Sequence, residues 1–168
     1  MLERTHSRWH AVVPAAIVAL GLGASGPAAA GDAALNTAVQ RFANQVINAR
    51  DVGAVDRVFT KDYRQHTPQA RNLSAKAFKG FAAAMFKAFP DVRASYTPLV
   101  ARGDKIAVIG AVSGTHKGAF FGMKPTGRKI KWTEMHVFRI RNGRIAEHWV
   151  QADMFGIVQQ IRAPAKKK

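Results

Sequence analysis

The chain contains no cysteine among its 168 residues, and acidic residues are scarce. Without thiols it can form neither disulfides nor thiolate metal sites, so packing of a core has to stabilise the fold. Ten acidic residues are outnumbered by 26 lysines and arginines, which gives a formal net charge of +16. This excess favours attraction to acidic surfaces or anionic ligands. Nucleic-acid binding is not expected, because the basic residues are spread along the chain without an interleaved aromatic block.

Long apolar runs are also missing, apart from one near the N-terminus. Arg4 and Arg8 precede an apolar stretch over residues 11–22, and small residues follow up to Ala30. This order is typical of a secretory signal peptide, and the stretch is shorter than the ~20 residues that an uncleaved membrane anchor needs. We therefore expect cleavage after Ala30 and export to the periplasm or the medium.

Cleavage at that position would leave 138 residues, with 24 basic and 9 acidic side chains, and no membrane span in the mature chain. This length suits a single core and is too short for two domains. The sequence therefore predicts a signal peptide over residues 1–30, one domain over 31–162 and a basic tail over 163–168.

Several signatures of catalytic chemistry are absent. The sequence has no glycine-rich phosphate loop, no G-x-S-x-G motif and no H-E-x-x-H motif. Nucleotide, serine-hydrolase and zinc-protease chemistries therefore have no support. Strand-spaced histidines and glutamates without a third ligand are weak signs of a metal site, so we expect neither a metal nor a cofactor.

The first half of the expected domain shows helical periodicity. Apolar residues recur at helical spacing over residues 34–50, and a short second helix is expected over 52–59. A third helix is predicted over 75–88, with Ser74 as its N-cap. The residues expected on its buried stripe are Phe78, Phe81, Ala82, Met85 and Phe89.

The segment between the second and third helices is expected to be a loop. Tyr63 and His66 lie in it, and we expect both to form part of a pocket wall. The common alternative for such a histidine is a place on the surface.

The second half of the domain shows strand periodicity instead. Extended segments are predicted over residues 92–101, 105–116 and a hairpin over 129–154, followed by a short helix over 155–161. Helices followed by antiparallel strands predict an α+β domain. In this fold three N-terminal helices lie on the concave side of a curved antiparallel sheet.

The hairpin carries the candidate active site. Its turn at Asn142-Gly143 is the strongest short-range hairpin signal. Alternate residues of the first strand share one face, which is apolar except for Glu134 and His136. Burying a polar group without a partner costs ~2–7 kcal/mol, so this pair either hydrogen-bonds within the core or takes part in chemistry. The apolar residues on that face are Ile130, Trp132, Phe138 and Ile140.

Two turn geometries place different side chains opposite the Glu134/His136 pair. A two-residue turn places Trp149 opposite His136. A three-residue turn with a bulge places His148 opposite His136 and Val150 opposite Glu134. Since a one-residue slip moves every side chain to the other face, the two registers predict different sites.

Spaced motifs along nearly the whole expected mature chain resemble the SnoaL-like polyketide (ester) cyclase family. They are D-Y-R-Q-H-T-P at residues 62–68, F-P-D at 89–91, G-T-H-K-G at 114–118, P-T-G-R at 125–128, and N-G-R-I with E-H-W at 142–149. The resemblance implies the nuclear-transport-factor-like fold, a cone around a deep pocket. It also implies a homodimer formed through the sheet.

The resemblance further implies where catalysis would take place. Cyclases of this family close a polyketide ring by an aldol reaction with a pocket carboxylate as acid/base, without metal or cofactor. That carboxylate directly follows the tryptophan of the E-H-W motif, a position that Val150 occupies here. Valine cannot transfer a proton. Glu134 and His136 match the preceding polar pair, His66 matches a further pocket residue, and the match favours the register with Val150 on the face of Glu134.

These observations give two functional hypotheses. In the first, the protein is a cofactor-free cyclase- or isomerase-like enzyme acting on a small hydrophobic carbonyl compound. Glu134 is then the base, His136 orients it and His66 polarises the substrate carbonyl. In the second, it is an exported, non-catalytic protein that binds a hydrophobic small molecule. The substrate-binding residues expected in either case are Tyr63, Phe121, Trp132, Phe138, His148 and Val150.

Overall fold

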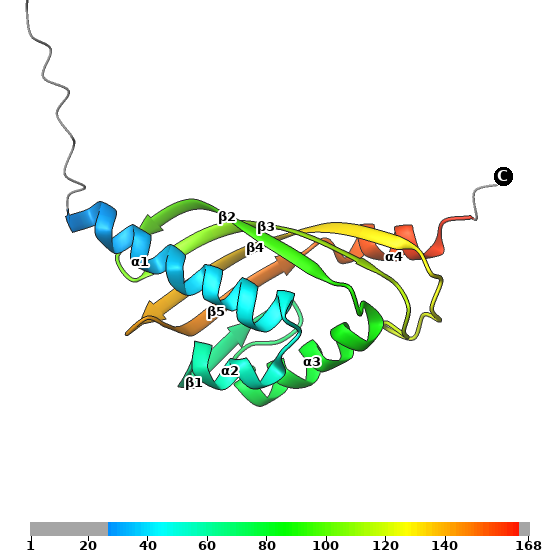
Figure 1. Cartoon of the computed structure of the whole chain (residues 1–168), viewed down its shortest axis with the longest axis horizontal. Coiled ribbons are helices and arrows are strands. Elements are labelled where there is room, and N and C mark those ends of the chain that lie inside the picture. The colour runs from blue at the N-terminus through cyan, green and yellow to red at the C-terminus, as the bar shows by residue number, and fades with distance from the viewer. Residues whose placement is uncertain (1–26, 165–168) are drawn as a thin grey trace, which may run out of the picture.

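The computed structural model describes the backbone of residues 27–164 and the side chains of residues 31–164. Its elements are α1 (Pro27–Phe42), η1 (Ala43–Asn48), η2 (Val52–Ala54), α2 (Val55–Val58), β1 (Phe59–His66), α3 (Ala75–Ala88), β2 (Arg93–Arg102), β3 (Lys105–Thr115), β4 (Lys129–Arg141), β5 (Arg144–Ala152) and α4 (Met154–Arg162) (Figure 1). Of the expected signal peptide, only residues 27–30 are described, and they belong to the first turn of α1. Within the described part, no helix is long and apolar enough to cross a membrane.

The five strands form one open, curved sheet in the order β1-β5-β4-β3-β2. The pairings β2–β3, β3–β4 and β4–β5 are antiparallel, whereas β1 runs parallel to β5. Helix α1 crosses one face of the sheet, and α3 lies near β1 at its lower edge (Figure 1). We call the face covered by helices the inner face. The predicted α+β class and curved sheet are confirmed.

Strand β1 is an element that the sequence did not predict. Residues 59–66 were expected to end a helix and form a loop. Instead they form an edge strand with Phe59, Tyr63 and Gln65 buried. A register shift between Phe59 and Arg64 interrupts the pairing with β5, so the period-two pattern of a strand is broken.

The predicted third helix is confirmed as α3. The Ser74 hydroxyl accepts a hydrogen bond from the Ala77 amide, as expected of an N-cap. Phe78 and Met85 are buried as predicted, but Phe81 is 48% exposed. Because Phe81 lies at the edge of the apolar stripe, it does not reach the core.

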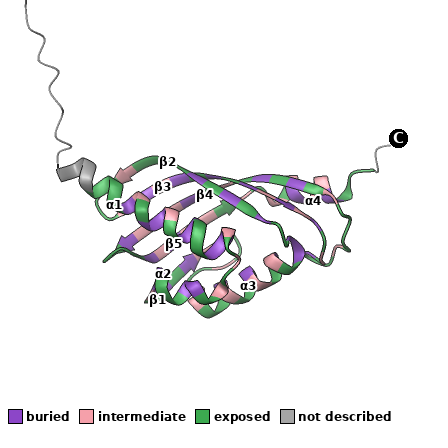
Figure 2. Ribbon diagram, viewed as in Figure 1, coloured by how far each residue is buried: buried purple, intermediate pink, exposed green. Residues whose placement is uncertain are grey.

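The core lies between the inner face and the helices, where buried residues face one another (Figure 2). Phe42 of α1 is at its centre, with ring centroids 5.8 Å from Phe59, 5.9 Å from Phe78 and 5.7 Å from Phe138. Burying a phenylalanine stabilises a fold by about 1.5–3 kcal/mol. The aromatic cluster therefore fixes α1, α3 and β1 against the strands that carry the site.

The turn of the β4–β5 hairpin has two residues. Asn142 and Gly143 both have positive φ, 51° and 70°, and Arg141 pairs with Arg144. This is the geometry of a type I′ turn, which asparagine and glycine favour.

The register then shifts at a bulge that neither turn geometry predicted. Ile140 pairs with Ile145 but Arg139 pairs with Glu147, so Ala146 is the extra residue. As a result Val150, rather than Trp149 or His148, is opposite His136. The facing pairs differ from both predictions, yet Val150 lies on the face of His136, as the resemblance favoured.

Candidate active site

Strand β4 separates polar and apolar side chains as its alternation predicted. Trp132, His136, Phe138 and Ile140 are buried, Glu134 is half-buried, and Lys129, Lys131 and Arg141 are exposed. The interior face that was predicted from the sequence is therefore confirmed. A carboxylate and an imidazole lie on this face, and both have hydrogen-bond partners there.

Five inner-face side chains form a continuous hydrogen-bonded chain, which we call the inner network. The Tyr63 hydroxyl is 3.1 Å from His148 Nδ1, and His148 Nε2 is 2.8 Å from His136 Nδ1. His136 Nε2 is 3.0 Å from Glu134 Oε2. Trp132 Nε1 donates to the other carboxylate oxygen, Oε1, at 2.8 Å. The network thus runs from strand β1 through β5 to β4.

An assignment with one proton on each imidazole satisfies every contact in the inner network. A carboxylate only accepts hydrogen bonds, so His136 donates from Nε2 to Glu134. His136 Nδ1 is then an acceptor, and it receives the Nε2 proton of His148. His148 Nδ1 in turn accepts from the Tyr63 hydroxyl. All donors therefore point toward Glu134, and both imidazoles are neutral.

Burial supports this assignment. It lowers the pKa of His148 well below its usual range, and any proton added to the neighbouring His136 or His66 would lower it further. Burial also raises the pKa of Tyr63 well above its usual range, which keeps the phenol protonated as a donor. The histidine in the middle of the network is thus held neutral at neutral pH.

Tyr96 of β2 is a further neighbour of Glu134. Burial, together with the nearby Glu134 carboxylate, raises the pKa of Tyr96 well above its usual range. The Tyr96 ring meets His136 edge-on at 4.9 Å and lies over Gly110, where a Cβ would come within 2.7 Å of Tyr96 Cε1. Gly110 therefore makes room for the tyrosine ring.

Exposure varies along the inner network. The Glu134 side chain is 16% exposed and that of His136 only 3%. The Phe138 ring stacks on both histidines, at 5.3 Å from His136 and 4.5 Å from His148. Val150 is half-buried opposite His136. The network therefore has a closed end at Tyr63 and a partly accessible end at Glu134.

His66, which was expected to polarise the substrate carbonyl, is not part of this network. In β1 it pairs with Trp149 of β5, on the outer face of the sheet. Its Nε2 lies 2.8 Å from Glu147 Oε1, its ring stacks on Trp149 at 5.1 Å, and Glu147 also accepts from Arg139. Despite partial burial, the hydrogen bonds from His66 and Arg139 lower the pKa of Glu147.

The E-H-W motif is therefore divided between the two faces. His148 points inward into the network, whereas Glu147 and Trp149 point outward and hold His66. The face of His66 was not predictable, because it depends on the parallel pairing of β1 with β5. Two neighbours of the predicted residues, Tyr96 and Glu147, were also missed. Gly110, opposite Glu134, is a signal that could have indicated Tyr96, because a glycine inside a strand can mark the close approach of another group.

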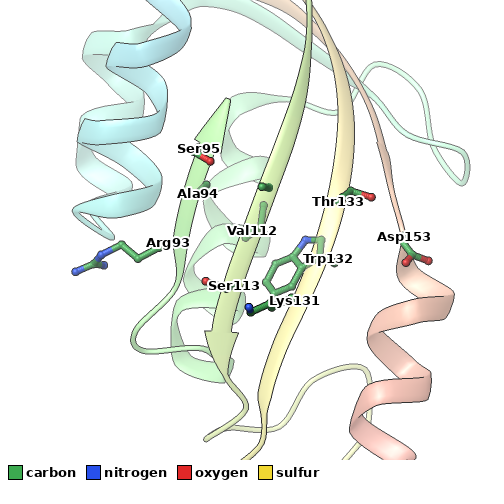
Figure 3. A pocket seen from close by; sticks show the side chains of 10 residues that line it. Arg93, Ala94, Ser95, Val112, Ser113, Lys131, Trp132, Thr133 and Asp153 are labelled. Carbon is green, nitrogen blue, oxygen red and sulfur yellow. The ribbon is translucent and has the colours of Figure 1, made fainter. Parts of the chain in front are cut away.

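Two cavities lie on the outer side of the sheet. One, of about 570 Å³, is lined by exposed residues including Ser95, Lys131 and Thr133 (Figure 3). Trp132 is the one member of the inner network that lines this cavity. Arg93 also lines it, and Figure 3 shows its guanidinium turned away from the other labelled side chains. The second, of about 400 Å³, is next to His66, Trp149 and Arg71.

Phe121, predicted to bind substrate, is not near the inner network. It lies in the loop between β3 and β4, and it is 66% exposed. Tyr63, Trp132, Phe138, His148 and Val150 all lie on the inner face, as the prediction required. Tyr63 and Phe138, however, are fully buried, so they pack and position other groups.

Comparison with known proteins decides the family. The model of the SnoaL-like polyketide cyclase family matches residues 37–161. The chain belongs to this family.

Two SnoaL-like relatives align with part of the chain. It is 32% identical over 63 residues to nogalonic acid methyl ester cyclase of Streptomyces nogalater, and 35% identical over 54 residues to aklanonic acid methyl ester cyclase of Streptomyces peucetius. These segments cover 38% and 32% of this chain. They span 47% and 37% of the relatives, which is less than half of each.

Solved SnoaL-like structures share the fold over most of the chain. A protein of Jannaschia sp. CCS1 assigned as a SnoaL-like polyketide cyclase superposes with a TM-score of 0.71 at 20% identity, covering 79% of this chain and 94% of that one. A protein of Acidithiobacillus ferrooxidans assigned as a polyketide cyclase gives a TM-score of 0.69 at 25% identity, with 79% and 96% covered. The family and fold that the spaced motifs predicted are confirmed.

Proposed function

We propose that this SnoaL-like protein is an enzyme that acts on a small hydrophobic carbonyl compound by cofactor-free acid/base chemistry. The observation that carries the proposal is the inner network. It directs two hydrogen-bond donors at a partly accessible carboxylate, Glu134. Burying this many polar side chains costs stability unless each has a hydrogen-bond partner. The inner network is therefore more typical of a functional site than of a core whose side chains only pack.

The geometry suits Glu134 as a general base. Its oxygens accept hydrogen bonds from Trp132 and His136, Tyr96 is a further neighbour, and a carboxylate has about four acceptor sites in all. These neighbours fix the orientation of the carboxylate, and a remaining acceptor site can take a proton from a substrate. His136 positions the base, and His148 with Tyr63 holds His136 in the required tautomer.

The proposed reaction begins when Glu134 removes a proton from a carbon next to a carbonyl group. The electron pair of that C–H bond forms an enolate, whose carbon attacks a second carbonyl carbon of the same molecule. A carbon–carbon bond forms, and the resulting alkoxide takes the proton back from Glu134, so no atom is lost or gained. The names of the two relatives, both methyl ester cyclases, support a carbonyl ester as the substrate class.

The position of His66 removes it from this mechanism. It lies across the sheet from Glu134 and is held by Glu147, so the carbonyl-polarising role expected from the sequence has no support.

A non-catalytic binding protein is the second candidate. Val150 stands where the resembled cyclases carry their acid/base, and both oxygens of Glu134 are already hydrogen-bonded within the protein. These two features favour a protein that holds a hydrophobic carbonyl compound without converting it.

Paired measurements separate the two functions. We expect Glu134→Gln to keep ligand affinity and to lower single-turnover conversion of cyclisable keto-esters by the ~10²–10⁴ typical of general-base loss. Glu147→Gln is the matched control, because it makes the same change on the outer face. If the wild type converts nothing and Val150→Asp gains activity, the missing carboxylate was never replaced, and the binding function takes its place.

We further propose that the protein is a homodimer that pairs through the outer face. Ile109 and Met135 are exposed there on neighbouring strands, and Ile109 pairs directly with Met135. Exposed apolar neighbours of this kind favour an interface. We expect light scattering after gel filtration to give a dimer for the wild type and a monomer for Met135→Arg. A monomeric wild type would contradict the proposal.

We propose export because basic, apolar and small residues follow one another in residues 1–30, as in a signal peptide. N-terminal sequencing of protein recovered from producing cells should begin at Gly31. A chain that begins at Met1 would contradict it.

A further inference from the structure

The loop between β3 and β4, residues 116–128, forms the end of the molecule next to the end of α3, and it is drawn in yellow-green and yellow in Figure 1. Its base is firmly attached. The amides of Lys117 and Gly118 donate to the Ala88 carbonyl at 2.8 and 3.1 Å, and the His116 carbonyl accepts from Gly127 at 2.9 Å. The loop is therefore an anchored projection with a defined tip.

The tip is a tight turn with an aromatic residue in an unfavourable conformation. Phe120 and Met123 exchange backbone hydrogen bonds of 3.1 and 2.9 Å, and the two residues between them both have positive φ: 45° at Phe121 and 76° at Gly122. A bulky residue with positive φ is strained, and such strain is found at functional positions.

A second turn in the chain has the same geometry and carries a residue that suits it. The β4–β5 hairpin has the same pair of positive φ angles, and there the first position is Asn142. Asparagine tolerates this conformation far better than phenylalanine. At the loop tip, Phe121 is nevertheless present and 66% exposed, and its ring touches the buried Phe120 edge-on at 4.5 Å while most of it faces solvent.

The surroundings of the tip are uniformly basic in sequence. No acidic residue occurs between Asp104 and Glu134. The basic residues of the loop and the start of β4 are Lys117, Lys124, Arg128 and Lys129, of which the three lysines are exposed. The acidic group at the base of the loop, Asp91, is engaged by the amide and hydroxyl of Thr115.

We propose that this loop docks the protein on an anionic lipid surface, with Phe121 inserted at the level of the headgroups. An aromatic side chain at a tip surrounded by lysines matches the chemistry of interfacial binding, in which apolar burial adds to attraction by anionic lipids. The formal net charge of +16 acts in the same direction. The inference goes beyond the proposed reaction and does not depend on it.

Docking would also orient the site. Phe120, next to Phe121, is buried with its ring 5.0 Å from Phe89, and Phe89 lies 5.4 Å from Trp132, a member of the inner network. The loop that meets the lipid is therefore linked through Phe89 to Trp132, which donates to Glu134. A hydrophobic ligand dissolved in the membrane would reach this end of the protein first.

The test places a fluorescent reporter at the tip of the full chain. Trp9→Phe first removes the tryptophan of the expected leader, and the signal of this parent, which keeps Trp132 and Trp149, is subtracted from that of each reporter variant. Phe121→Trp is then compared with Val100→Trp. Val100 is a matched control, because it is 63% exposed and lies near the opposite end of the sheet. Both variants are mixed with vesicles that contain brominated acyl chains, made either of phosphatidylglycerol and phosphatidylcholine or of phosphatidylcholine alone.

We expect quenching of the reporter at position 121 on the phosphatidylglycerol vesicles, and little quenching at position 100. Adding Lys124→Gln to the Phe121→Trp chain should weaken quenching about fivefold, the loss expected for one lysine near an anionic surface. Lys61→Gln, on the distant strand β1, should leave it unchanged. Because the leader is present in every variant, quenching at these two positions decides the result independently of total binding.

Equal quenching at positions 121 and 100, or none at 121, would overturn the proposal. A spectral shift at position 121 that follows protein concentration without vesicles would overturn it in favour of a second copy of the chain. Phe121→Asn separates a structural role from docking. It should keep or raise the free energy of unfolding while lowering vesicle binding roughly tenfold, the loss expected for one exposed aromatic.

Discussion

Lowering the pH should destabilise the fold through His148. This side chain is buried, with Tyr63 donating to one ring nitrogen and His136 accepting from the other. Burial places its folded-state pKa well below the ordinary value of 6.5. The unfolded chain therefore binds more protons below pH 6.5, so the stabilisation is complete above that pH and is lost as the pH falls toward the folded pKa. A single proton gives a slope of at most ~1.4 kcal/mol per pH unit.

Urea unfolding between pH 7.5 and 5 measures this slope. Other histidines and carboxylates titrate in the same range, so the wild type is compared with His148→Gln, which lacks the titrating group and retains them. We expect the free energy of unfolding to fall with acid more steeply in the wild type than in the variant, by up to ~1.4 kcal/mol per pH unit. Equal slopes, or a wild type that gains stability in acid, would refute the assignment of a neutral imidazole at the centre of the inner network.

Two further substitutions, one on each face of the sheet, test its packing, and Gly80→Ala in α3 is the control for the first. Gly110→Ala should lower the free energy of unfolding by about 1–3 kcal/mol, because the new Cβ would meet the ring of Tyr96, whereas Gly80→Ala, with open space around it in α3, should raise it by ~0.5–1 kcal/mol. Equal effects in chemical denaturation would contradict the close approach. Glu147→Gln should cost about 1–2 kcal/mol, because the neutral amide offers only one oxygen to the two donors His66 and Arg139, and it should leave turnover intact.

The sequence predicted those parts of the fold in which local pattern and environment agree. Alternation along residues 129–141 predicted which side chains face inward, because reversing the faces would bury several cations. The third helix was correct because Ser74 marks its start and Pro90 follows its end. The placement of Glu134 and His136 on one buried face followed from the same alternation.

Features that depend on pairing between distant segments were not predictable. At the bulge, the consecutive residues Ile145 and Ala146 are both buried. Their burial results from the pairing of β5 with β4, so the sequence of β5 alone does not predict it. The face of His66 depends on a parallel neighbour in an edge strand. The hydrogen bond from Tyr63 to His148 joins residues 85 positions apart. Sequence therefore identified most members of the site but not the connections between them.

The most direct test of the account is proton abstraction itself. Carbon-bound hydrogens next to the carbonyls of a keto-ester exchange with deuterium oxide when a base removes them, and NMR follows this exchange without knowledge of the natural substrate. We predict that the wild type accelerates exchange, that Glu134→Gln lowers the rate by ~10²–10⁴ with affinity retained, and that Glu147→Gln exchanges like the wild type. Exchange by the wild type at the rate of buffer alone, or undiminished exchange by Glu134→Gln, would contradict the claim that Glu134 is the base.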